Sequence, residues 1–160
     1  WHGLRDGLIN TVATDHAPFD FASQKPMGKD DFTKIPNGIP SLEERINLLY
    51  TYGVARSRLD LHTFVNVAST AVAKQFDLFP RKGAIQPGAD ADLVVFDPNY
   101  RGKISAKTQH MAVDYSAFEG WPIEGRPSVV TVRGQVAARD GQFTGTLGRG
   151  QFLQRKPSHF

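Results

Sequence analysis

The sequence predicts an α/β fold, and three observations along its 160 residues support that prediction. A mainly apolar run without alternation, typical of a strand buried on both faces, comes first at 8–13. Two segments with apolar residues at helical spacing follow it. The last part changes to short apolar runs separated by glycine-containing turns. We therefore expect an α/β layer followed by a small β-sandwich or part of one.

The first predicted element, the strand Leu8–Ala13, is followed by Asp15 and His16, where a buried strand would reach the edge of its sheet. A polar segment at 20–40 comes next and is dense in Gly, Pro, Lys and Asp, so it reads as a loop. A loop of this length is uncommon in a compact domain unless it has a function. The end of this strand is therefore a candidate site.

Two helices are predicted after the loop. Ser41 and Glu44 match a capping box, in which each side chain bonds a backbone amide at the helix start, and Gly53 suits the end of this helix. Asp60 is the expected N-cap of the second helix. The apolar positions are Leu42, Ile46, Leu49 and Tyr50 in the first helix, and Leu61, Phe64, Val65, Ala68 and Val72 in the second.

The sandwich part is predicted from strand and turn signals. A short strand is expected at 83–86 and a buried strand at Leu93–Phe96. Two further strands should flank Gly134, and the pair Asp140-Gly141 indicates another tight turn. The boundary between the helical part and the strands is expected near Pro80–Gly83.

Composition limits the partners that we expect. The net charge is only +3, and Lys and Arg are scattered apart from a modest cluster in "GRGQFLQRK", so no nucleic-acid partner is expected. No apolar run approaches the ~18 residues of a membrane span, so no membrane partner is expected either. The absence of cysteine from these residues excludes thiolate metal sites and cysteine nucleophiles and favours a cytoplasmic location.

Asp15 is the strongest candidate for chemistry. The carboxyl ends of parallel strands hold the active sites of barrels and open α/β sheets, and a carboxylate there can bind a divalent metal or move a proton. The alternative is that Asp15 merely caps the following turn, which the local pattern alone favours. None of the five histidines has a partner at i+2, i+3 or i+4, so no histidine metal clip is present.

Five strings carry a resemblance to a known family: "TDHAPF", "QKPMGKDDFTKIPNG", "EER", "GADADLVVFDP" and "KTQHMAVDYSAFEGWPIEGRP". Together they resemble the D-hydantoinase/dihydropyrimidinase family, cyclic amidohydrolases of the amidohydrolase superfamily. The resemblance runs from Trp1 to about Gly150. Dihydroorotases and allantoinases carry strings similar to "TDHAP", whereas "GKDDFTKIPNG" and "EGWPIEGRP" are much more specific.

The resemblance implies that the chain is the C-terminal portion of a longer enzyme. Residues 1–80 would supply the last strand, the active-site loop and the closing helices of a TIM-type (β/α)8 metal-dependent hydrolase barrel. Residues 81–145 would supply C-terminal strands of the flanking β-sandwich, and residues 146–160 a tail. Family members are usually homotetramers in which this tail reaches a neighbouring subunit.

The resemblance also implies an activity. Family members hold two divalent metal ions, usually zinc, and a bridging hydroxide opens the ring amide of 5,6-dihydropyrimidines or hydantoins. Asp15 matches the aspartate that binds one metal and passes a proton from the attacking water to the leaving ring nitrogen. Asn37 matches the asparagine whose backbone bonds the cyclic amide or imide substrate, and Gly38 would let that backbone approach closely.

The remaining metal ligands of the family match nothing in this chain. They are a His-x-His pair, a carboxylated lysine and two further histidines, so we expect the 160 residues by themselves to be inactive. Other interpretations stay open: an allantoinase or dihydroorotase, an isolated sandwich module, or a non-catalytic assembly protein similar to the collapsin-response mediator proteins. Those mediators lose the residues that match Asp15 and Asn37, and both are present here.

Overall fold

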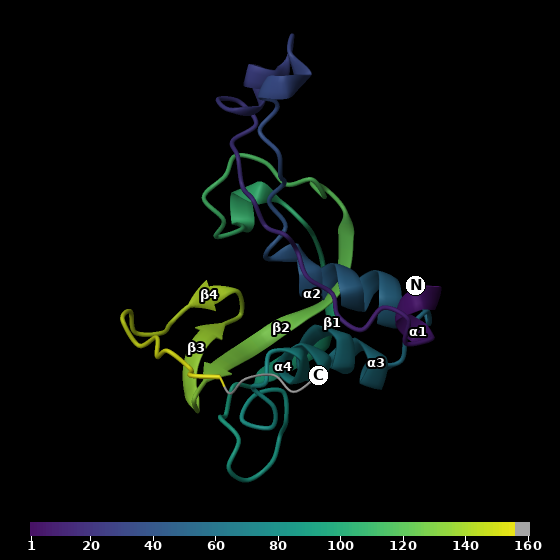
Figure 1. The fold of residues 1–160 in the computed structure, drawn as a ribbon, viewed down its shortest axis with the longest axis vertical. Coiled ribbons are helices and arrows are strands. Elements are labelled where there is room, and N and C mark those ends of the chain that lie inside the picture. Colours follow the sequence, from purple (N-terminus) through teal and green to yellow (C-terminus); the bar gives the residue numbers. More distant parts are fainter. Residues whose placement is uncertain (156–160) are drawn as a thin grey trace.

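The computed structural model describes residues 1–155, in which helices pack beside an antiparallel sheet and a long loop projects away from both (Figure 1). The last five residues of the predicted tail, 156–160, lie outside the described part. The helical elements include 3-10 and π-helical turns. In chain order they are α1 (His2–Arg5), η1 (Lys25–Gly28), η2 (Phe32–Lys34), α2 (Glu44–Leu49), η3 (Tyr50–Val54), α3 (Leu61–Val65), η4 (Asn66–Thr70), α4 (Ala71–Gln75) and η5 (Ala106–Thr108).

The sheet has four strands, and each pairs with its neighbour along the chain: β1 (Val94–Lys103), β2 (Pro122–Val132), β3 (Gln135–Arg139) and β4 (Gln142–Phe143). Two-residue turns, Arg133-Gly134 and Asp140-Gly141, close the last two hairpins, and all four residues have positive φ. Such turns match the twist of paired strands, which is why glycine occurs there. The predicted strands around Gly134 and the Asp140-Gly141 turn are confirmed, but residues 83–86 form no strand.

The second predicted helix is confirmed, and it begins where the sequence indicates. The Asp60 carboxylate accepts a hydrogen bond from the Thr63 amide at 2.6 Å and so caps α3. α3, η4 and α4 form one continuous helical segment. Its buried face holds Phe64 and Val67, whereas Leu61 and Val65 of the predicted stripe are more than half exposed. Within residues 1–155, no helix is both long and apolar enough to cross a membrane.

The predicted capping box is wrong. α2 begins at Glu44, but the Ser41 hydroxyl donates to the Thr14 carbonyl at 3.0 Å instead of capping the helix. The Glu44 carboxylate is buried and accepts a hydrogen bond from the Ser116 hydroxyl at 2.6 Å. Both side chains are used by segments far away in the sequence. The spacing of Ser and Glu fits a local cap, but long-range partners outcompete it here.

The predicted strand Leu8–Ala13 does not form. Its backbone runs without a ladder, and Leu8 is 82% exposed. The Val12 amide donates to the Val67 carbonyl of η4, and the Val12 carbonyl accepts from the Arg45 guanidinium. A strand is stable when neighbouring strands pair its amides and carbonyls, and residues 1–155 place no such neighbour beside this segment.

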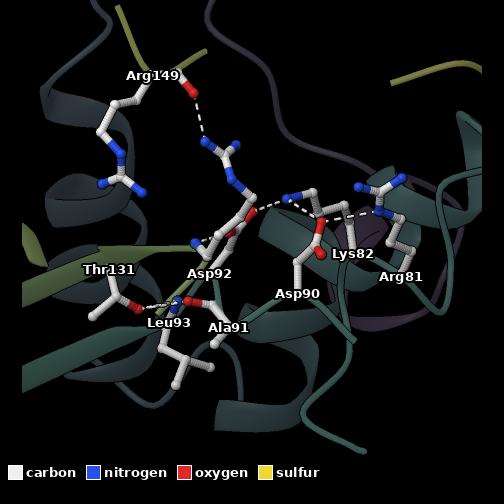
Figure 2. Close-up of polar contacts among 9 residues, drawn as sticks. Arg81, Lys82, Asp90, Ala91, Asp92, Leu93, Thr131 and Arg149 are labelled. Atoms are coloured by element: carbon white, nitrogen blue, oxygen red, sulfur yellow. Dashed lines mark hydrogen bonds and ion pairs between the residues drawn. The ribbon is translucent and has the colours of Figure 1, made fainter. Parts of the chain in front are cut away.

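A small ion-pair network fastens the segment before β1 to the sheet (Figure 2). The Lys82 ammonium lies between the carboxylates of Asp90 and Asp92. Partial burial disfavours its charge, but hydrogen bonds and attraction from both carboxylates outweigh burial and raise the pKa of Lys82. The Thr131 hydroxyl of β2 also holds this segment, because it donates to the Ala91 carbonyl and accepts from the Leu93 amide.

Candidate functional site

The segments that carry the two predicted site residues are fastened to each other. Ser41 binds both sides of Asp15: its hydroxyl donates to the Thr14 carbonyl at 3.0 Å and its amide to Nδ1 of His16 at 3.1 Å. The Ala17 amide donates to the Ile39 carbonyl at 3.3 Å. Residues 14–17 and 37–41 therefore form one unit, which we call the clip.

Asp15 adopts a left-handed backbone conformation, with φ of 48°. Aspartate tolerates this region better than most residues, and an outlier of this kind at a turn reorients the side chain. The side chain is exposed, and among residues 1–155 it makes no hydrogen bond or ion pair. The turn-cap interpretation of Asp15 requires such a bond to the backbone, so the geometry does not support it.

His16 has a fixed role in the clip. A backbone amide can only donate, so Nδ1 of His16 is the acceptor in its bond from Ser41. The neutral ring in this bond carries its proton on Nε2. A protonated ring nitrogen has no lone pair for a metal, and Nδ1 is already engaged, so His16 in this bond is a structural member of the site rather than a ligand.

Asn37 is exposed at the tip of the second clip segment, and Gly38 explains how that segment fits. Gly38 has φ of 135°, and a Cβ added there would lie 2.4 Å from the Ala17 Cβ and 2.6 Å from the Ala17 carbonyl oxygen. Any side chain at this position would push the two segments apart. The close approach that the glycine permits is therefore made to Ala17 of the first segment.

Lys25 was not singled out by the sequence, yet it reaches into this unit. Its ammonium donates to the Pro36 carbonyl and to the Gly38 carbonyl, each at 2.6 Å. The ammonium also lies 5.3 Å from the centre of the Phe19 ring, a cation–π contact. A lysine in a loop carries no sequence signal for such a contact, because its partners are backbone oxygens.

The projecting loop has a second attachment, to the segment between β1 and β2. The Asp114 carboxylate accepts hydrogen bonds from the Phe21 amide at 2.6 Å and the Ala22 amide at 2.9 Å. These bonds from the Ala22 and Phe21 amides hold the pKa of Asp114 below its ordinary value of 3.8. The Tyr115 ring adds an aromatic contact to Phe21, with centroids 5.5 Å apart.

An apolar hollow of about 720 Å³ opens beside the clip. Thr14 and Ser41 of the clip line it, together with side chains of α1 and α2 and the two tryptophans. Neither Asp15 nor Asn37 lines it, so the hollow lies next to the predicted reaction site without containing it.

The described residues do not form a metal centre by themselves. Within residues 1–155, no three His, Asp or Glu side chains gather closely enough to hold a metal ion. A catalytic metal needs about three protein ligands, and Asp15 would supply one of them. The described residues therefore supply only part of a metal site.

Comparisons with known proteins identify the family of the chain. Residues 1–137 match the Amidohydrolase family. The chain is 50% identical to a D-hydantoinase of Geobacillus stearothermophilus over 155 residues, which is 97% of this chain and 33% of that relative. It is 44% identical to a D-hydantoinase of Streptomyces coelicolor over 97% of this chain and 33% of the relative. The chain thus spans about a third of the length of these relatives.

Solved structures give the same result. A D-hydantoinase (dihydropyrimidinase) from Thermus sp. superposes with a TM-score of 0.96 and 64% identity, over 100% of this chain and 35% of that one. An L-hydantoinase (dihydropyrimidinase) from Arthrobacter aurescens superposes with a TM-score of 0.90 and 37% identity, over 97% of this chain and 34% of that one. These matches confirm the predicted fold class, part of a barrel hydrolase followed by part of a β-sandwich. The chain belongs to the amidohydrolase family.

Proposed function

We propose that the chain is the C-terminal portion of a metal-dependent cyclic amidohydrolase of the dihydropyrimidinase/hydantoinase type. The whole protein would hydrolyse the ring amide of 5,6-dihydropyrimidines or hydantoins. One observation supports this function above others: the clip presents Asp15 as an exposed carboxylate with no partner among residues 1–155. A residue that served only to shape a turn would bond its own backbone.

In this proposal Asp15 supplies one ligand to a centre of two divalent ions, with zinc the expected metal. The other ligands would come from parts of the whole protein outside these 160 residues. When bound, the ions would lower the pKa of the attacking water and polarise the ring carbonyl. Asp15 would accept a proton from that water and deliver it to the ring nitrogen as the carbon–nitrogen bond breaks, because an amide nitrogen leaves readily only when protonated.

Asn37 would bind the substrate through its backbone. A cyclic amide or imide presents an N–H donor and a C=O acceptor side by side, and one peptide backbone position offers the complementary pair. Within residues 1–155, no hydrogen bond occupies the amide or carbonyl of Asn37. This pairing would recognise the ring that hydantoins and dihydropyrimidines share, and it would not separate the two substrate classes.

The proposal extends to organisation and assembly. Residues 1–80 would close the barrel, residues 81–145 would contribute sandwich strands, and residues 146–160 would be a tail. We propose a cytoplasmic homotetramer for the whole protein, with the tail contacting a neighbouring subunit. Exposed apolar side chains in the tail, Leu147 and Phe152, are compatible with such a contact.

The role of Asp15 is tested by Asp15→Ala in the whole protein. Hydrolysis of dihydrouracil and hydantoin should fall by about a thousandfold or more, because one group provides both a metal ligand and the proton transfer. Bound metal per subunit, measured by mass spectrometry, should fall as well. Asp30→Ala is the matched control, because Asp30 is an exposed carboxylate of the projecting loop. Near-normal activity of Asp15→Ala would contradict the assignment.

A further inference from the structure

One ammonium group holds the backbone on both sides of Asn37. Lys25 begins the turn η1, and its side chain crosses the base of the loop to the Pro36 and Gly38 carbonyls, at 2.6 Å each. Hydrogen bonds from a charged donor are shorter and stronger than neutral ones. The residues on each side of Asn37 are therefore anchored through their carbonyls by a single residue that lies 12 positions earlier in the chain.

The contacts divide the carbonyls of this stretch into two kinds. Those of Pro36 and Gly38 are turned to Lys25, whereas the Asn37 backbone has no hydrogen bond within residues 1–155. Carbonyls that share a bonding partner must point to the same side of the chain. The Pro36 carbonyl belongs to the peptide that precedes Asn37, and the Gly38 carbonyl belongs to the Gly38–Ile39 peptide, so the two bonds anchor the chain just before and just after the Asn37 carbonyl and leave the Asn37 amide and carbonyl available.

Lys25 is also well suited to this task by its surroundings. It is half-buried, and among the described residues no carboxylate pairs with it, so the two carbonyls and the Phe19 ring are its partners. A carboxylate partner would compete for the ammonium and draw it away from the loop. A lysine ammonium has three donors on one atom, which allows it to bond two converging carbonyls at once.

We infer that Lys25 is a positioning residue that orients the Asn37 backbone for the amide edge of the substrate. This inference rests on the proposed function, because it assigns Lys25 to the substrate contact of that same site. Lys25 touches the neighbours of Asn37 and acts through them. Its loss should weaken substrate binding in the ground state and the transition state alike, which raises KM and leaves kcat nearly unchanged.

The test is Lys25→Met in the whole protein loaded with zinc, with steady-state kinetics on dihydrouracil and hydantoin. We expect KM to rise about tenfold, with kcat within about twofold of the wild type. Lys29→Met is the matched control: Lys29 is an exposed lysine of the same loop, and both of its kinetic constants should stay unchanged. Circular dichroism checks the fold, and Lys25→Gln takes the place of Lys25→Met for the same test if the methionine variant does not fold.

A chemical rescue separates positioning from general damage to the loop. Lys25→Cys should show the raised KM, and alkylation with 2-bromoethylamine should restore the ammonium and return KM towards the wild-type value; alkylated wild-type protein is the control. An unchanged KM in an active Lys25→Met protein, a fall in kcat alone, or no rescue would overturn the role of Lys25 only. A wild-type protein that hydrolyses neither substrate would overturn the proposed function and the role of Lys25 together.

Discussion

The segment 8–40, whose loop projects away from the rest of the molecule, and the sheet β1–β4 are built in opposite ways (Figure 1). Each strand of the sheet pairs with the strand next to it in sequence, so the chain itself supplies every ladder. The segment 8–40 has no strand, and a few long-range side-chain contacts hold it, chiefly from Ser41, Lys25 and Asp114. The residues proposed for catalysis and substrate binding, Asp15 and Asn37, lie in the segment 8–40, which few contacts hold in place.

This difference shows what each kind of motif encodes. Turn pairs such as Asp140-Gly141 specify a local shape that forms wherever two adjacent strands can pair. The apolar run Leu8–Ala13 has the composition of a buried strand, but a buried strand needs neighbours on both sides. In the described residues that run pairs with no strand: Leu8 and Ile9 are exposed in a bend, and Val12 is half-buried against the core.

The largest expected contrast is in hydrogen exchange of the isolated 160-residue chain. Amides in the ladder of β1, β2 and β3 should exchange at least about a hundredfold more slowly than those of 8–14, because paired amides exchange only when the sheet opens. The expected exceptions in the first segment are the Val12 amide, bonded to η4, and the Leu8 and Ile9 amides, bonded to the Gly3 carbonyl. Mass spectrometry or NMR measures both rates. Equal protection of the two regions would contradict the comparison.

A second prediction tests the helices that lie between the two regions. Val67 is 2% exposed and belongs to the core with Leu49, Leu59 and Phe64. Val67→Ala should lower the free energy of unfolding by about 2 kcal/mol, because it leaves a cavity in that core. Val65→Ala is the matched control on the same helical segment: Val65 is 51% exposed, and its loss should cost less than about 0.5 kcal/mol. Urea unfolding measures both, and equal losses would contradict the assigned core.

Sequence reasoning succeeded where one short stretch decides the structure. The cap at Asp60 and the turns at Gly134 and Asp140 were predicted because their partners lie within three residues. The capping box of Ser41 failed because its hydroxyl bonds Thr14, 27 residues away. Local spacing carries no information about such partners.

In the candidate site, too, the sequence predicted some residues and missed others. Asp15 and Asn37 were found through strings that resemble a family, and the structure places their two segments side by side. Lys25 and Asp114 were missed, since their partners are backbone groups that any residue provides. The metal set could not be completed from the sequence, and no cluster among residues 1–155 completes it.

A third prediction concerns the Asp60 cap, where a smaller effect is expected. Asp60→Ala leaves the Thr63 amide without its acceptor, so the midpoint of thermal unfolding should fall by a few degrees. Asp60→Asn keeps an acceptor oxygen and should lose much less. Circular dichroism follows both variants. An alanine variant as stable as the wild type would show that this cap is dispensable.

The smallest effect is expected at the loop attachment. Because its folded pKa is lowered, the Asp114 carboxylate holds the Phe21 and Ala22 amides fully above pH 3.8 and releases them as the pH falls through that lower pKa. NMR shifts of both amides should titrate together with a midpoint below 3.8. Asp114→Asn should abolish this step. A midpoint at or above 3.8 in the wild type would contradict the attachment.

The most direct test of the central claim uses the whole protein that contains this chain. The purified protein is incubated with dihydrouracil and with hydantoin, and loss of the ring amide is followed with and without a chelator. We predict that a ring opens, that chelation stops the reaction and that zinc restores it. A folded, metal-loaded protein that opens neither ring would contradict the account and would favour an assembly role for this branch of the family.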